Sequence, residues 1–331
     1  MEFGSVDTIL QSVQNRLNDL HTGYALYSGN TSIFTPNRPS AQLAAADSVL
    51  PFLGGPKSDN QWGAYAGGFG QFMQVNGDGN APGYSVQNSG ATVDFDKQFD
   101  RGLVGGVTLD YINGEAGLDN GGSASMQGGR GGVYGAWYGR NAYLEGQLGG
   151  GVSSYDTKRS ALGGTANGST DGYEMDGMLG GGYDFKYKSL IAGLLAETHY
   201  TYADVNGFTE SGSASPMQIM DNNNESLWTL VGCRLAYEWQ IHKQTIRPEF
   251  RLGWRHEFLD TQRQIQSSFA SGAGSVFQVD GPSLGSDSLS VGAGLSTRCT
   301  EHLSLFLSYD GELGRNQTTS HAVNGGMSWD F

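Results

Sequence analysis

Apolar and polar residues alternate one by one along most of the chain after residue 60. The pattern is sharpest over residues 244–262, where the apolar set is Ile246, Phe250, Leu252, Trp254 and Phe258 and the interleaved polar set is Arg247, Glu249, Arg251, Arg255 and Glu257. Successive side chains of a strand point to opposite faces, so this alternation predicts a β-strand with one apolar and one charged face.

Segments of this kind recur twelve times. Their ranges are 62–77, 84–99, 101–114, 122–139, 140–157, 168–186, 188–206, 223–241, 244–262, 284–299, 300–314 and 318–331. The segments are about 14 to 18 residues long, whereas strands of soluble proteins are mostly about five or six residues long. We therefore expect long antiparallel strands of the kind that cross a membrane.

The connections between these segments alternate between short and long. Tight junctions fall near residues 100, 140, 187, 242–243 and 300, and mostly longer connections cover 78–83, 115–121, 158–167, 207–222, 263–283 and 315–317. Short turns at one rim and long loops at the other are typical of outer-membrane barrels. An even number of strands also places both ends of the barrel at the periplasmic rim.

Aromatic residues gather at the ends of the apolar faces, as in the girdles of membrane barrels. They are Tyr111, Tyr183, Tyr237, Trp239, Phe258, Trp329 and Phe331. In a soluble sandwich the polar faces would look outward into water, but that fold explains neither the girdles nor the strand length. The predicted fold is an all-β transmembrane, 12-stranded antiparallel outer-membrane β-barrel.

The last segment, Ser320–Phe331, is expected to close the barrel by pairing with 62–77, which removes both free edges. Phe331 should then lie at the periplasmic rim.

The amino-terminal segment has a helical pattern instead. Ile9, Leu10, Val13, Leu17 and Leu20 recur at three- and four-residue steps, which predicts an amphipathic helix from Val6 to His21. Asp7 is expected to cap its start, and Gly23 lies just past its expected end. Residues 22–60 are interpreted as an irregular connector with a short alanine-rich piece near 41–49.

Glycine makes up 53 of the 331 residues, and the many aromatic residues argue that this glycine belongs to β structure and not to disorder. Glycines at 149–151 and 180–182 fall in the middle of strands, where another backbone could come close. We expect the approaching element to be the amino-terminal helix, which would place that helix in the pore.

Composition narrows the function further. A net charge of −14 argues against a nucleic-acid partner. The sequence has no run of eighteen apolar residues, so no transmembrane helix is expected. Cys233 and Cys299 are predicted to be unpaired. Residues 1–5 are interpreted as a cloning scar, with the natural amino terminus and any signal peptide upstream.

Several motifs together resemble the carboxy-terminal translocator domain of type Va autotransporters of Gram-negative bacteria. They are Trp62-Gly63-Ala64-Tyr65, Asn76-Gly77-Asp78-Gly79-Asn80-Ala81-Pro82-Gly83-Tyr84, Gly207-Phe208-Thr209-Glu210-Ser211-Gly212, Arg251-Leu252-Gly253-Trp254-Arg255-His256-Glu257-Phe258, Ser308-Tyr309-Asp310-Gly311-Glu312-Leu313-Gly314 and Trp329-Asp330-Phe331. The resemblance implies a barrel domain over 61–331, with a pore helix and linker over 6–60.

This resemblance also implies partners and a role. An outer-membrane translocator and anchor would export a passenger domain that precedes Val6. Trp329 and Phe331 would form the signal that the barrel-assembly machinery reads, and outer-membrane lipids would surround a monomer. Some relatives cut the passenger off inside the barrel at an Asn-Asn pair; Asn15 and Asn18 are not adjacent, so self-cleavage is not expected.

Charged residues on the polar faces are the candidate lumen residues. They are Glu145, Asp176, Asp184, Glu197, Arg234, Glu238, Arg247, Glu249, Arg251, Arg255 and Glu257, with Arg16 and Asp19 as possible partners on the helix. Any one of these pairs could also fill the lumen without a role in transport.

Two other functions are compatible with parts of this pattern. A porin-like channel would use the same barrel with an open pore, which the helix argues against. A hydrolase at the barrel rim would need a catalytic arrangement, and the six histidines at 21, 199, 242, 256, 302 and 321 form no Ser/His/Asp or metal-ligand pattern. We therefore expect no enzymatic activity, no metal and no cofactor.

Overall fold

The computed structural model describes residues 2–29, 62–99, 102–241, 244–259, 261–272, 274–300 and 302–331. Its elements are α1 (Glu2–Gly29), β1 (Trp62–Val75), β2 (Tyr84–Phe99), β3 (Leu103–Leu118), β4 (Ser123–Tyr138), β5 (Ala142–Ala161), β6 (Gly164–Tyr187), β7 (Leu190–Val205), β8 (Phe208–Thr209), β9 (Met217–Ile219), β10 (Asn222–Tyr237), β11 (Trp239–Ile241), β12 (Gln244–Glu257), β13 (Gln264–Phe269), β14 (Phe277–Asp280), β15 (Asp287–Arg298), β16 (Leu303–Arg315) and β17 (Thr318–Asp330). The expected connector over 30–60 lies outside the described residues.

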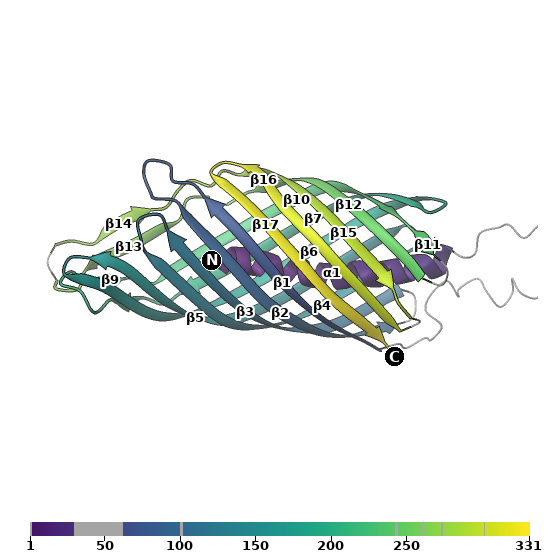
Figure 1. Ribbon diagram of the computed structural model, residues 1–331, viewed down its shortest axis with the longest axis horizontal. Helices are drawn as coiled ribbons and strands as arrows, with labels where there is room; N and C mark the ends of the chain where they lie inside the picture. The colour runs from purple at the N-terminus through teal and green to yellow at the C-terminus, as the bar shows by residue number, and fades with distance from the viewer. Residues whose placement is uncertain are drawn as a thin grey trace, which may run out of the picture.

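The long strands form a closed antiparallel barrel (Figure 1). Neighbouring strands follow one another in sequence order, β10 pairs with β12, and the first strand β1 pairs with the last strand β17. Because β11 continues β10 after one residue, the described barrel has twelve strands. The predicted fold and the predicted closure by the last segment are confirmed.

Closure fixes the position of the carboxyl terminus. Gly63 on β1 lies opposite Asp330 on β17, and the register continues to Val75 opposite Thr318. The backbone N–H of Phe331 donates to the carbonyl of Trp62 at 2.9 Å, and the N–H of Trp62 donates to the carbonyl of Phe331 at 3.1 Å. Both ends of the barrel therefore lie at the rim that carries the tight turns.

The outer face of the barrel is apolar, as the alternation predicts. The seven girdle aromatics are all exposed, as are Leu109, Met175, Leu194, Leu252 and Leu307 between them. Inward-facing neighbours such as Asp110 and Asp176 are buried. Cys233 and Cys299 are unpaired, as expected. In the described part of the chain, no helix is both long and apolar enough to cross a bilayer.

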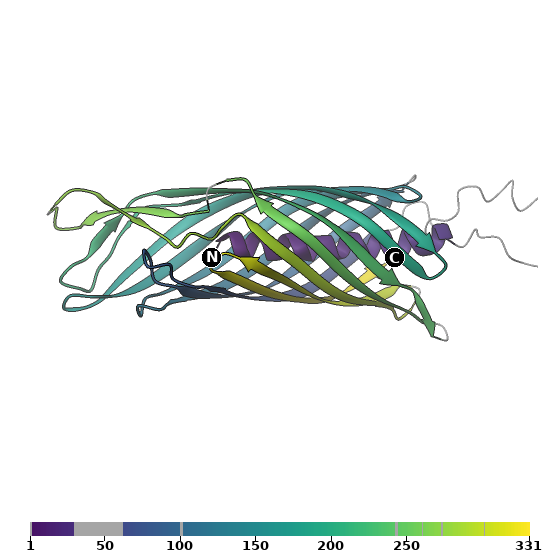
Figure 2. The same ribbon diagram turned by 90° about the horizontal axis from the view of Figure 1, so that it is seen from above.

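Four short strands form a second sheet at the long-loop end, in the order β14, β13, β9, β8 (Figure 2). They come from the two longest described connections, one between β7 and β10 and the other between β12 and β15. These connections were expected to be irregular loops. The sequence signal was weak because strands of two to six residues show too little alternation to be detected.

The prediction of a longer connection over residues 158–167 is wrong. β5 and β6 run past the expected ends and meet in a turn at Leu162 and Gly163, where Gly163 has a φ of 77°. Tight hairpin turns require positive φ, which glycine adopts without strain. The polar residues that suggested a loop belong to strand ends that project beyond the apolar band.

The predicted helix is also too short. α1 runs from Glu2 to Gly29, so Gly23 does not end it. A glycine inside a helix costs only about 1 kcal/mol relative to alanine, which neighbouring helix-forming residues offset. Asp7 lies inside α1 and does not cap it, because its carboxylate accepts hydrogen bonds from Trp228 and Arg255 of the barrel wall.

The glycines in the middle of the strands were expected to let α1 come close, and this expectation is wrong. A side chain at Gly149 would meet the Arg130 guanidinium at 2.4 Å, and one at Gly182 would meet the Tyr143 ring at 2.6 Å. These glycines make room for large inward-facing side chains of neighbouring strands.

A valine at Gly326 should weaken the barrel, because a Cβ there would lie 2.6 Å from the Ala66 carbonyl oxygen of the paired strand. We expect a loss of about 1–3 kcal/mol in the free energy of unfolding. The measurement is the urea dependence of the shift between folded and unfolded migration on a denaturing gel. Gly325→Val is the matched control, since its Cβ meets its nearest neighbour, Leu307, at 3.5 Å; equal losses in both variants would contradict the prediction.

Candidate functional site

The site is the lumen of the barrel, where α1 runs from about the middle of the barrel to the rim of tight turns (Figure 1). Polar groups of α1 bond to strands all around the wall: Ser12 to Tyr65 of β1, Arg16 to Asp96 of β2, the Leu17 carbonyl to Tyr138 of β4, Gln14 to Glu197 of β7, Asn18 to Arg234 of β10, Asn15 to Ser308 of β16 and Asp19 to Ser328 of β17. Helical residues advance by about 100° each, and on that spacing these positions follow the order of the strands around the barrel. The wall therefore encloses the helix.

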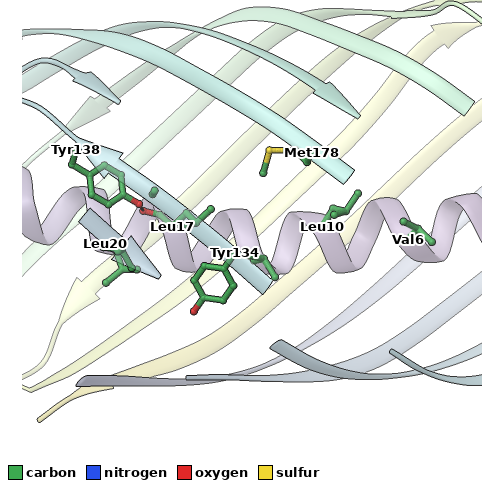
Figure 3. Packing of buried hydrophobic residues seen from close by; sticks show 10 residues of the cluster. Val6, Leu10, Leu17, Leu20, Tyr134, Tyr138 and Met178 are labelled. Carbon is green, nitrogen blue, oxygen red and sulfur yellow. Dashed lines mark hydrogen bonds between the residues drawn. The ribbon is translucent and has the colours of Figure 1, made fainter. Parts of the chain in front are cut away.

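One side of α1 is apolar and packs against β3 to β6. Figure 3 shows Val6, Leu10, Leu17 and Leu20 facing this part of the wall. Their cluster contains Val104, Tyr134, Ala136, Tyr138 and Met178. A second cluster joins Ile9 to Phe69, Ile112, Met126 and Tyr155. Apolar burial is non-directional, so these contacts hold the helix against the wall, while polar contacts set its rotation.

Arg16 carries the most enclosed charge of the helix. Its side chain is fully buried, and its Nε and Nη2 donate to the two carboxylate oxygens of Asp96 at 2.6 and 3.0 Å. Nη2 also reaches Asp330 at 3.3 Å, and Nη1 donates to Asp19 at 3.0 Å. A buried guanidinium is stable only where carboxylates compensate its charge. The carboxylates of the wall therefore favour arginine at this position of the helix.

A stack of three side chains anchors the amino-terminal half of the helix. The guanidinium of Arg255 lies 3.9 Å from the ring centre of Trp228, and the ring of His199 stacks on Trp228 with 3.7 Å between the ring centres. Arg255 and Trp228 both donate to the carboxylate of Asp7, at 3.0 and 3.3 Å. Asp7 thus meets the basic part of the wall, about half a turn around the helix from Arg16.

Arg234 anchors the helix nearer the other rim. It donates to both oxygens of Asp184, at 3.0 and 2.5 Å, and to Asn18 at 2.9 Å. Its Nη2 lies 2.8 Å from Nδ1 of His21, whose ring stacks on Tyr138. One wall arginine therefore orders two side chains on successive turns of α1.

Other charges of the wall bond to one another. Arg130 binds Asp176 and lies 3.8 Å from Asp110 and 3.6 Å from Glu174. Arg251 donates to Asp310 at 2.8 Å, and Arg247 donates to Glu249 at 3.3 Å. These contacts neutralise charge within one strand, as between Arg247 and Glu249, or across an intervening strand, as between Arg130 and Asp176 and between Arg251 and Asp310.

A cavity of about 130 Å³ lies beside the polar side of α1. Its lining includes Gln11, Gln14, Glu197, His199 and Arg251. The volume would hold several water molecules, and the lining offers them both donors and acceptors. Among the described residues, no group of three or more His, Cys, Asp or Glu side chains is placed to hold a metal ion.

The structure separates the lumen residues expected from the sequence into three groups. Bonded to α1 are Glu197, Arg234, Glu249 and Arg255, and Asp184 lies 3.5 Å from His21 of α1; paired within the wall are Asp176, Arg247, Arg251 and Glu257; Glu145 lines the cavity and Glu238 is half-buried beside β11. Glu257 accepts from Ser226 at 2.6 Å.

The sequence analysis missed the main partners of Arg16. Asp96 and Asp330 lie on the polar faces of the second and last strands, next to the exposed Phe95 and Trp329. Arg130 and Trp228 were missed as well. The alternation that identified the other lumen residues also places these four on the inward faces of their strands. Trp228, for example, has the parity of Arg234 on β10 and is buried, whereas Val231 and Leu235 are exposed.

Outside the membrane-spanning part, two carboxylates hold loops together. Burial opposes the ionisation of Glu210, but the bonded Arg159 guanidinium and the Met217 N–H lower its pKa overall. The N–H groups of Ser283, Asn80 and Ala81 lower the pKa of Asp78. The Asp78 contact with Ser283, at 3.0 Å, joins the first loop to the connection before β15.

The sequence profile of the autotransporter beta-domain family matches residues 62–310. Two proteins of Serratia marcescens, each described as an extracellular serine protease, are 28% identical over 137 residues and 25% identical over 150 residues. These alignments cover 41% and 45% of this chain but only 13% and 14% of the relatives, so the chain spans a small part of their length.

Solved structures share the fold. The translocator domain of the autotransporter NalP from Neisseria meningitidis superposes with a TM-score of 0.68 at 16% identity, covering 88% of this chain and 94% of that one. The beta domain of the Bordetella autotransporter BrkA gives a TM-score of 0.62 at 19% identity, covering 81% and 98%. The transport unit of AIDA-I from Escherichia coli gives 0.51 at 14%, covering 88% and 97%.

Replacing Arg130 by methionine should destabilise the barrel strongly, because three buried carboxylates would lose their common cation. The expected loss is about 3–5 kcal/mol in the free energy of unfolding, measured by urea titration. Arg159→Met is the control: its pair with Glu210 is partly exposed, so the loss should stay below about 1 kcal/mol. Similar losses in the two variants would rule out a special role for the buried cluster.

Proposed function

The chain belongs to the autotransporter beta-domain family, and we propose that its barrel exports a passenger domain joined to the amino-terminal end of α1 and then anchors it. The chain is an outer-membrane translocator of a Gram-negative bacterium. The finer proposals concern how the passenger is held, how the barrel is assembled, and where any catalytic activity lies.

The proposal rests on the direction in which α1 runs through the lumen. The carboxyl end of α1 lies toward the rim of tight turns, where β1 also begins, and its amino end points toward the rim of long loops (Figure 1). Short turns of outer-membrane barrels face the periplasm. A chain continuing upstream of α1 would therefore leave the pore on the outside of the cell.

The lumen contacts support a plugged pore after export. Asp184, Glu197, Arg234, Glu249 and Arg255 would hold the helix, with Arg16 as its main charged anchor, and the pairs within the wall would keep the lumen polar enough to admit a polypeptide. Residues 6–60 would then act as pore helix and linker, and residues 61–331 as the barrel domain. A porin-like open channel has no such use for the apolar face of α1.

We assign no catalytic activity to the barrel itself. Asn15 donates to Ser308 at 3.2 Å, and Asn18 accepts from Arg234, so the two asparagines face different strands. This arrangement supports a passenger that stays attached. Any activity of the whole protein, including the protease activity named for the Serratia relatives, would belong to the passenger.

The carboxyl terminus is the basis for the assembly partners that we propose. Trp329 lies on β17, the strand that closes the barrel, and Phe331 directly follows this strand; both side chains are exposed. An extended terminal strand with aromatic side chains on one face suits recognition by the barrel-assembly machinery through added strand pairing. The finished barrel would be a monomer surrounded by outer-membrane lipids.

Deleting residues 6–22 should open the pore. A helix with its side chains is about 10–12 Å wide, so its removal should raise the single-channel conductance of the purified barrel on the order of tenfold. Gln11→Ser, which changes only the lining of the cavity, should leave conductance low. A high conductance that is the same with and without the helix would overturn the plugged-translocator proposal in favour of a porin.

Deleting Phe331 should impair assembly more than it weakens the finished barrel. The deletion removes two backbone hydrogen bonds to Trp62, together about 1–3 kcal/mol, and it removes the terminal aromatic residue. In cells we expect severalfold fewer heat-modifiable barrels, while the assembled fraction unfolds at nearly the same urea concentration. Phe331→Trp should assemble normally. An assembled yield that follows stability alone would argue against a recognition role.

A further inference from the structure

The seam between β1 and β17 closes the barrel through strands that are farthest apart in the sequence. Across this seam, Asp330 of β17, Gly63 of β1 and Asp96 of β2 lie opposite one another in a single row. Asp330 and Asp96 are two strand spacings apart, so their backbones are about 10 Å from each other. Both side chains lie on the polar inner face.

Arg16 of α1 lies over the middle of this row. Its guanidinium bonds to Asp96 on one side of β1, at 2.6 and 3.0 Å, and to Asp330 on the other side, at 3.3 Å. A Cβ at Gly63 would lie 2.2 Å from Nη2 of Arg16, so only glycine leaves room for this arrangement. The row Asp-Gly-Asp thus forms a binding site for a planar, forked cation.

Neighbouring residues of α1 reinforce the contact on both sides of the seam. Asp19 accepts from Ser328 of β17 at 2.6 Å, and the hydroxyl of Ser12 lies 3.4 Å from that of Tyr65 on β1. Asn15 donates to Ser308 of β16. This side of the helix therefore contacts four adjacent strands, two on each side of the seam.

We propose that α1 is an internal clamp of the barrel: Arg16, by binding Asp96 and Asp330 together, ties the last strand to the second strand and stabilises the closing seam. This goes beyond filling the pore. Apart from this bridge, the seam is held by backbone pairing and by a side-chain hydrogen bond from Gln71 of β1 to Ser320 of β17, at 3.3 Å. Loss of the guanidinium leaves two enclosed carboxylates, one on each side of β1, without a compensating charge. Seam stability is thereby coupled to occupancy of the lumen.

The test is native-state hydrogen exchange of the whole chain in lipid nanodiscs, read by mass spectrometry over β1 and β17. Arg16→Lys keeps the charge but not the fork, and Asp330→Asn removes only the negative charge that faces Arg16 on β17. In both we expect amides of β1 and β17 to exchange about tenfold faster. Asp7→Asn is the matched control, because its carboxylate is as enclosed as that of Asp330 but binds Arg255 on β12.

The clamp is supported if Asp330→Asn speeds exchange at the seam while single-channel conductance stays low, since the bond between Arg16 and Asp96 still holds the helix. It is overturned if Asp7→Asn speeds seam exchange equally, if neither seam variant does, or if Asp330→Asn opens the pore. Passenger export is read separately, as surface exposure of the passenger in the full-length protein. Absence of export from the parent protein would refute the proposed function without changing the result at the seam.

Discussion

The constraint on which this structure depends is the lack of water in the hydrocarbon of a membrane. A backbone N–H or C=O left unpaired there costs several kcal/mol, so a sheet survives only if it has no edge. β1 and β17 therefore pair along their length, and every other long strand of the barrel has a partner on both sides. The apolar outer face and the two rims follow from this closure.

Closure creates a second demand, on the inside. The inward faces are polar and carry many charges, yet most of these side chains are shielded from solvent once α1 lies in the lumen. Buried charges must be paired, and the wall pairs them in two ways: strand to strand, as at Arg130, and strand to helix, as at Arg16, Arg234 and Arg255. The helix is therefore a structural part of the lumen as much as its plug.

The helix matches the wall because its own surface is divided. Its apolar side meets the aromatic and aliphatic residues of β3 to β6, and Arg16 and Asp7, about half a turn apart, meet acidic and basic positions. Turning the helix would place apolar side chains against the charged lining of the cavity. In the proposed function, anchoring would use this match, because a helix that fits the lumen in one orientation would seal it after export.

The sequence by itself determined the strand number, the inward and outward faces and the closing pair. Over every long segment, alternation with a period of two shows which face of the strand is apolar and meets lipid and which is polar and faces the lumen. It did not determine the end of α1, because Gly23 is tolerated inside the helix, or the end of β5, whose last residues are mostly polar. It also did not determine the small outer sheet, whose strands are too short to show a period. Nor did it identify the partners of Arg16. Asp96 and Asp330 flank Gly63 only after β17 has closed onto β1, so their common guanidinium is a property of the tertiary structure.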